Sequence, residues 1–170
     1  MATNNQLQID KDLPNKKITV TRYFNAAPEQ VWRAWTESEL LDKWWAPKPW
    51  RAETKTMDFK EDGYWLYAMV SPEGDKHWSK VDFKSIEAGK SFEAISYFAD
   101  ENGNPSNAFK TTYSTWKNEF SASNGGTKVV VEIIFPTEAD MQQLIAMGFE
   151  GGFTMGLNNL EELLEGELVK

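Results

Sequence analysis

His77 is the only histidine in the 170-residue chain, and it is the side chain best suited to proton transfer near neutral pH. The ordinary pKa of histidine, about 6.5, lets it donate or accept a proton under physiological conditions. No pattern in the sequence places a carboxylate or a nucleophile beside it, so we assign no catalytic residue. Two interpretations of His77 stay open, a contact with a bound ligand and a hydrogen-bonded place in the core.

Charged residues at alternate positions mark the outer face of each expected strand and thereby fix its inner face. Where no charge orients a strand, at residues 64–70, we take the larger side chains as inward-facing. The inner face obtained in this way includes Trp65, Tyr67, Met69, His77, Phe83, Ser96, Phe98, Ser114, Trp116 and Asn118. A few polar groups among apolar ones are typical of a small-molecule site, although they would also satisfy one another or a buried water.

The elements that must position these side chains follow from hydrophobic periodicity. Residues 16–25 alternate as a strand, and Pro28 begins a short helix that ends near Thr36. Thr36 and Glu39 resemble a capping box for a second short helix, and Thr137 is placed to cap a long C-terminal helix. Between the helices, turn signals separate further strands at 64–70, 77–86, 91–98, 111–121 and 127–135. The order predicts an α+β domain whose curved antiparallel sheet buries one face against the last helix.

Four glycines interrupt the predicted C-terminal helix. Gly148, Gly152 and Gly156 recur every four residues on one stripe, and Gly151 lies beside them. Each costs about 1 kcal/mol relative to alanine inside a helix, so the stripe requires a structural reason. In one interpretation, another element packs closely against the stripe or the helix kinks there. In the other, the missing side chains leave room for a ligand. Phe149 and Phe153 would then also contact that ligand.

Trp44, Trp45 and Trp50 follow the first helix closely. Trp44 continues the apolar face of the second short helix toward the core. Trp45 and Trp50, beside two prolines, either form the rim of a cavity or a small aromatic cluster that holds the loop. Arg22 falls on the inner side of its strand, where an unpaired charge is costly, so we expect a carboxylate partner for it.

Composition excludes several classes of function. The net charge of -8 opposes binding to nucleic acid or to acidic membrane surfaces, and no apolar run is long enough for membrane insertion. The absence of cysteine and the single histidine argue against a metal site, and we expect no cofactor. We expect a cytoplasmic monomer with a loosely attached segment at 1–15, one domain at 16–165 and a tail at 166–170.

Several blocks resemble one known superfamily. They are Ala26-Ala27-Pro28-Glu29-Gln30-Val31-Trp32, Leu40-Leu41-Asp42-Lys43-Trp44-Trp45, Gly63-Tyr64-Trp65-Leu66-Tyr67 and Gly148-Phe149-Glu150-Gly151-Gly152-Phe153. The chain is similar to the SRPBCC (START-like, Bet v 1-like) superfamily, in the branch named for the activator of heat-shock-protein-90 ATPase homologue. The resemblance implies a helix-grip fold, a sheet wrapped around a C-terminal helix with a hydrophobic cavity between them. It does not imply one activity.

The expected function is therefore binding of a small hydrophobic or aromatic, lipid-like ligand in this cavity. One alternative is a chaperone-interacting domain like the ATPase activator, although the eukaryotic co-chaperone carries an additional N-terminal domain. A second alternative is a cyclase or hydrolase using the same cavity. The candidate ligand contacts are Trp45, Trp50, Trp65, Tyr67, Met69, His77, Phe83, Ser96, Phe98, Ser114, Trp116, Asn118, Phe149, Gly152, Phe153 and Gly156.

Overall fold

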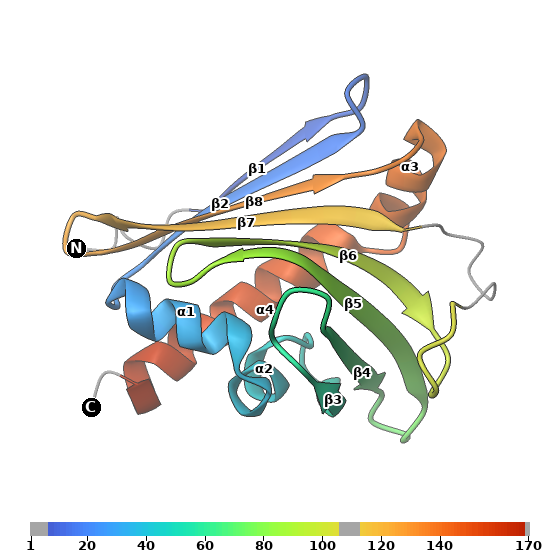
Figure 1. The fold of residues 1–170 in the computed structure, drawn as a ribbon, viewed down its shortest axis with the longest axis horizontal. Coiled ribbons are helices and arrows are strands. Elements are labelled where there is room, and N and C mark those ends of the chain that lie inside the picture. The colour runs from blue at the N-terminus through green and yellow to red at the C-terminus, as the bar shows by residue number, and fades with distance from the viewer. Residues whose placement is uncertain (1–6, 106–112, 169–170) are drawn as a thin grey trace.

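A curved antiparallel sheet forms the frame of the computed structural model, which describes residues 7–105 and 113–168 (Figure 1). The strands are β1 (Leu7–Asp12), β2 (Lys17–Phe24), β3 (Arg51–Met57), β4 (Tyr64–Val70), β5 (Lys76–Glu87), β6 (Ser91–Ala99), β7 (Ser114–Ser123) and β8 (Gly126–Ile134). Their order in the sheet is β1-β2-β8-β7-β6-β5-β4-β3. The helices are α1 (Pro28–Thr36), α2 (Ser38–Trp44), α3 (Glu138–Ala146) and α4 (Phe149–Leu163), and a π-helical turn, Leu164–Leu168, follows. This is the expected α+β helix-grip fold.

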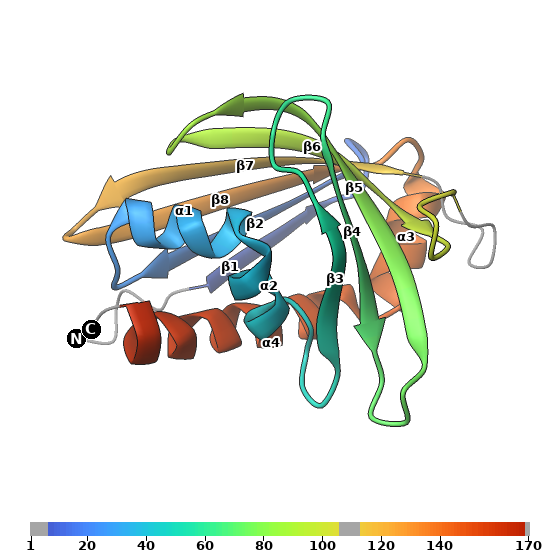
Figure 2. The same cartoon turned by 60° about the horizontal axis from the view of Figure 1, so that its bottom comes forward.

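The concave face of the sheet holds α4. Figure 2 shows α4 running across the open side of the sheet, with α1 and α2 beside it and α3 at one end. Ile18 and Ile133 from the strands and Leu157 and Leu160 from α4 are all buried between these layers. The period-2 pattern of the strands and the helical spacing of the apolar residues in α4 therefore produce one core.

The N-terminal edge of the sheet is a strand that the sequence analysis did not predict. Within the segment expected to be loosely attached, Leu7–Asp12 form β1 and pair with β2 at six positions. Leu7 and Ile9 are half-buried while Gln8 and Asp10 are exposed. The strand is amphipathic, but its polar composition hid the alternation. The predicted strand positions 111–112 lie outside the described residues.

The expected long C-terminal helix is present as α4, but the expectation that it runs without a break from Thr137 is wrong, because the chain breaks between α3 and α4. Gly148 has a φ of +91°, in the left-handed region that glycine adopts without strain. Thr137 caps α3 as expected, its hydroxyl accepting the Asp140 backbone N–H at 3.1 Å. Gly148 thus forms the turn between two helices. It does not carry the free-energy cost of a glycine inside a helix.

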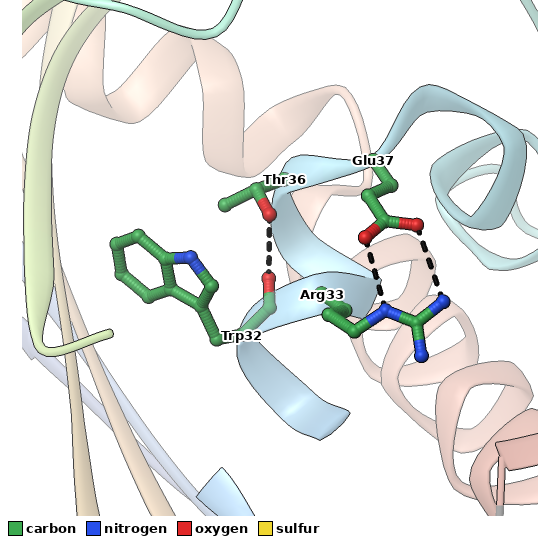
Figure 3. Close-up of polar contacts among 4 residues, drawn as sticks. All are labelled: Trp32, Arg33, Thr36 and Glu37. Atoms are coloured by element: carbon green, nitrogen blue, oxygen red, sulfur yellow. Dashed lines mark hydrogen bonds and ion pairs between the residues drawn. The ribbon is translucent and has the colours of Figure 1, made fainter. Parts of the chain in front are cut away.

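The junction of α1 and α2 also differs from the expected capping box. Figure 3 shows that the Thr36 hydroxyl donates to the carbonyl oxygen of Trp32, 2.9 Å away in the preceding turn. Glu37, which occupies the N-cap position of α2, makes no side-chain cap and instead pairs with Arg33 at 3.0 Å. The threonine hydroxyl bonds within its own helix, and the N-cap position of α2 falls on the next residue, Glu37.

Two contacts fix α4 against the rest of the molecule. A Cβ added to Gly156 would lie 3.2 Å from the Trp45 carbonyl oxygen and 3.3 Å from that of Trp44, which shows how closely α4 approaches the end of α2. Farther along, buried Arg22 of β2 pairs with Glu161 and donates to Asn158 at 3.1 Å. The expected carboxylate partner of Arg22 is therefore confirmed.

We expect the replacement Gly156→Leu to lower the free energy of unfolding by about 2–3 kcal/mol, because the new side chain would push α4 away from the carbonyl groups of α2. The measurement is denaturant unfolding followed by circular dichroism. Gly151→Leu is the matched control: nothing lies within 4 Å of a Cβ at this exposed position. It should keep or raise stability through its higher helix propensity. Equal stability of the two variants would contradict close packing at Gly156.

Candidate ligand-binding cavity

A cavity of about 280 Å³, which we call the outer cavity, lies between the concave face of the sheet and the α3–α4 junction. This volume is near the lower end of the range typical of small-molecule sites, roughly 300–1,000 Å³. Its lining is Trp45, Pro47, Tyr67, Met69, Ser79, Ser96, Tyr97, Phe98, Tyr113, Ser114, Trp116, Phe135, Asp140, Leu144, Met147, Gly148, Phe149, Gly152 and Phe153.

The structure brings most of the expected site residues to this cavity. Strand alternation and the helix pattern correctly placed Trp45, Tyr67, Met69, Ser96, Phe98, Ser114, Trp116, Phe149, Gly152 and Phe153 on its wall. Trp65, Phe83 and Asn118 line a smaller, adjacent space of about 40 Å³, the inner chamber. Trp45, Ser96 and Trp116 border both spaces. The two spaces are therefore neighbours, separated by these shared side chains.

Trp50 and His77 line neither space, and the expected inward, buried position of His77 is wrong. His77 is exposed near the start of β5, and its ring lies 5.5 Å from the ring of Trp50. Residues two and four positions farther along β5, Ser79 and Val81, are buried. The alternation identified the correct side of the strand, but the strand end extends beyond the part of the sheet that other elements cover.

The glycine stripe splits into two different environments. Gly148 and Gly152 line the outer cavity, whereas Gly156 packs against the backbone of α2 and lines neither space. At Gly152 the nearest atom to an added Cβ is the Pro47 Cγ, 3.7 Å away. Both interpretations of the stripe therefore apply, close packing at one end and open volume toward the other.

The polar groups of the outer cavity come from neighbouring strands. The Trp45 indole donates to the Tyr67 hydroxyl at 2.9 Å, and the Trp116 indole donates to the Ser114 hydroxyl at 3.0 Å. Ser96 lies directly opposite Ser114 in the pairing of β6 with β7. Burial raises the pKa of the Tyr67 phenol, and its hydrogen bonds with Trp45 and Ser79 oppose this shift. Tyr67 thus presents a neutral hydroxyl to the cavity.

The mouth of the cavity contains residues that sequence reasoning missed. Tyr113, just before β7, and Met147, at the helix break, are exposed apolar side chains on its wall. Asp140 adds a carboxylate from the first turn of α3. Their proximity depends on the turn at Gly148, and the sequence analysis treated this segment as continuous helix.

Two kinds of feature are absent from the described part of the chain. Residues 7–105 and 113–168 contain no group of three or more His, Cys, Asp or Glu side chains arranged to hold a metal ion. Among the helices they form, none has the length and apolar character needed to cross a membrane.

The comparison with protein families gives one match, over residues 25–165, to the activator of Hsp90 ATPase homolog 1-like family. The chain belongs to this family. The match begins just before α1 and reaches the turn after α4, so it includes the helices and strands that build the cavity. A comparison with curated proteins found no similar sequence.

Solved structures share the fold over nearly the whole chain. A crystal structure of a protein from Mycobacterium smegmatis is 26% identical, covers 94% of this chain and 97% of its own, and has a TM-score of 0.86. A solution structure from Arthrobacter aurescens is 27% identical, with coverages of 93% and 91% and a TM-score of 0.86. One from Staphylococcus epidermidis is 29% identical, with coverages of 93% and 93% and a TM-score of 0.80.

Tyr67 should make the protein less stable at alkaline pH. Because its folded-state pKa is raised, the unfolded chain loses this proton first, so the contribution of Tyr67 to stability is complete below a pH of about 10 and is lost as the pH rises toward the folded-state pKa. Urea unfolding at a series of pH values should show a weaker alkaline decline for Tyr67→Phe than for the native chain. Tyr113→Phe, at an exposed tyrosine, is the control, and identical declines in both variants would contradict the expectation.

Proposed function

We propose that the protein binds a small apolar or aromatic, lipid-like molecule in the outer cavity. The observation that carries the proposal is the cavity itself, about 280 Å³ between the sheet and the α3–α4 junction, with mainly aromatic and aliphatic walls. Such a space favours an apolar ligand, because transferring apolar surface out of water into an apolar cavity lowers the free energy. Family membership and the shared fold support a binding domain of this kind.

The aromatic walls support a flat or ring-containing ligand. Trp45 and Trp116 have ring centroids 6.0 Å apart, and Trp116 and Phe153 meet edge to face at 5.8 Å. Rigid rings held in this way give a ligand a large contact area without ordering flexible chains on binding. The Tyr67 and Ser114 hydroxyls add a small number of oriented polar groups.

The geometry supports binding better than the cyclase or hydrolase alternative. His77, the only histidine, is exposed outside the cavity wall. The Tyr67 phenol keeps its proton well above neutral pH because burial raises its pKa. The described wall therefore lacks a histidine, the side chain best suited to proton transfer near neutral pH.

Family membership favours a second candidate function, binding to an Hsp90-type chaperone. The family is named after a homologue of the protein that activates the Hsp90 ATPase. This interaction would use the outer surface of the domain. The two candidate functions therefore predict NMR shifts at different residues, those of the cavity for a small ligand and those of the outer surface for a chaperone.

Mass spectrometry of organic extracts from the purified protein tests the first proposal, followed by NMR titration with a panel of lipids and polyphenols. We expect a co-purifying apolar compound and shifts at Trp45, Trp116 and Phe153. Titration with Hsp90 is the parallel experiment. Shifts confined to the outer surface with the chaperone, and none with the panel, would favour the second candidate and contradict the first.

Gly152→Leu should abolish ligand binding while leaving the fold intact. Its side chain would enter the outer cavity, where the only described atom within 4 Å of the new Cβ is one of Pro47. We expect affinity for any panel compound that binds to fall by at least about 10-fold, the effect of a displaced contact worth roughly 1.4 kcal/mol. Gly151→Leu, one residue away on the exposed side of α4, should bind as the native chain does. Retained binding in folded Gly152→Leu would place the ligand elsewhere.

A further inference from the structure

The inner chamber contains two polar atoms that have no hydrogen-bond partner among the described residues. They are the indole nitrogen Nε1 of Trp35, a donor, and the amide oxygen Oδ1 of Asn118, an acceptor. Both side chains line the chamber, and the residues are only 4% and 3% exposed. Buried polar atoms are almost always paired, because an unpaired one loses its bonds to water on folding. Two of them beside one small space indicate that the space receives a polar group.

The other buried indoles show that the fold can satisfy this donor. Trp44 donates to the Ala34 carbonyl oxygen, Trp45 to the Tyr67 hydroxyl and Trp65 to the Thr54 hydroxyl, each at 2.9 Å. Trp35 lies among these side chains, with its ring centroid 5.0 Å from that of Trp44 and 6.0 Å from that of Trp45. Its N–H differs from theirs in having no acceptor among the described residues, although its side chain lines the chamber.

The orientation of the Asn118 amide follows from its one hydrogen bond. The amide nitrogen donates to the Phe92 carbonyl oxygen at 3.4 Å, on the neighbouring strand β6. This contact uses the donor end of the amide and leaves the oxygen as a free acceptor. The side chains that line the chamber therefore include one unpaired donor and one unpaired acceptor, together with the Ser96 hydroxyl, within mainly apolar walls.

We propose that the inner chamber binds the hydroxyl group of the molecule whose apolar body fills the outer cavity. This inference rests on the proposed function and narrows the ligand class to phenols and alcohols. A hydroxyl accepts from Trp35 Nε1 and donates to Asn118 Oδ1 with one oxygen atom. A carbonyl or ether satisfies only the indole, and an ammonium group satisfies only the amide oxygen.

The size and position of the chamber agree with this assignment. Its volume of about 40 Å³ exceeds the roughly 10–15 Å³ that one water-sized group needs, but it is too small for a ring with its substituents. Trp45, Ser96 and Trp116 border both spaces, so a ligand in the outer cavity needs only to project its polar end past these side chains. The apolar part stays in the outer cavity, against Trp116 and Phe153.

The test compares 2-naphthol with naphthalene, which differ by one hydroxyl group. We expect 2-naphthol to bind about 3- to 10-fold more tightly, the usual net effect of one or two neutral hydrogen bonds. In ¹H–¹⁵N spectra, the indole signal of Trp35, assigned from its loss in Trp35→Phe, should shift with 2-naphthol and much less with naphthalene. The shift itself is measured in the native chain, and the variant serves only to assign the signal.

Two variants locate the hydroxyl site. Asn118→Leu and Trp35→Phe should each bring the affinity ratio of the two compounds close to 1 while naphthalene binds as before. Ser114→Ala tests the competing location, because it removes a hydroxyl from the outer cavity. Whatever it does to the affinity for both compounds, 2-naphthol should still bind more tightly than naphthalene. Loss of the preference in Ser114→Ala alone would place the hydroxyl in the outer cavity and overturn the inference.

The failure of the inference is distinguishable from that of the proposed function. Equal affinities for the two compounds, with an unchanged Trp35 signal, would show that the chamber holds only water, and the outer cavity would remain the binding site. Absence of binding by either compound, together with no response to the lipid and polyphenol panel, would contradict the proposed function itself.

Discussion

The cavity depends on how closely α4 approaches the end of α2. Gly156 has no side chain, so the carbonyl groups of Trp44 and Trp45 lie against the backbone of α4. Asn159, one turn later, donates to the carbonyl oxygen of Trp44, the last residue of α2, at 3.5 Å and to that of Ala46 at 3.1 Å. This contact fixes the backbone at Trp45. The indole then reaches Tyr67 across the concave face and becomes a shared wall of both spaces.

The break at Gly148 has the complementary effect at the other end. If α3 continued the axis of α4, its residues would extend past the sheet rather than return to it. The turn brings Asp140 and Leu144 of α3 to the outer cavity, while Phe149 and Phe153 at the start of α4 stack with centroids 5.3 Å apart. The outer cavity stays open because α4 is held against α2 at Gly156 and the chain turns at Gly148.

The sequence predicted the inner face well because alternation is a local property. Charged residues on one side of β5, β6 and β7 were enough to assign Phe83, Ser96 and Trp116 to the other. It did not predict that His77 is exposed, since alternation says which side a residue occupies but not how far the covering elements extend. Strand β1 was missed for a related reason: an edge strand pairs on one side only and tolerates polar residues.

The glycines and buried tryptophans show why residue type alone could not define the site. Gly148, Gly152 and Gly156 have the same spacing, yet one turns the chain, one leaves volume and one allows two backbones to meet. In the same way, Trp35 and Trp44 are both buried, but only Trp44 has an acceptor for its indole. An unpaired buried donor costs about 1–3 kcal/mol, a substantial part of the stability of a typical domain. Bringing a polar group to the Trp35 indole would remove that cost, so the atom that weakens the empty fold is also the one that favours an occupant.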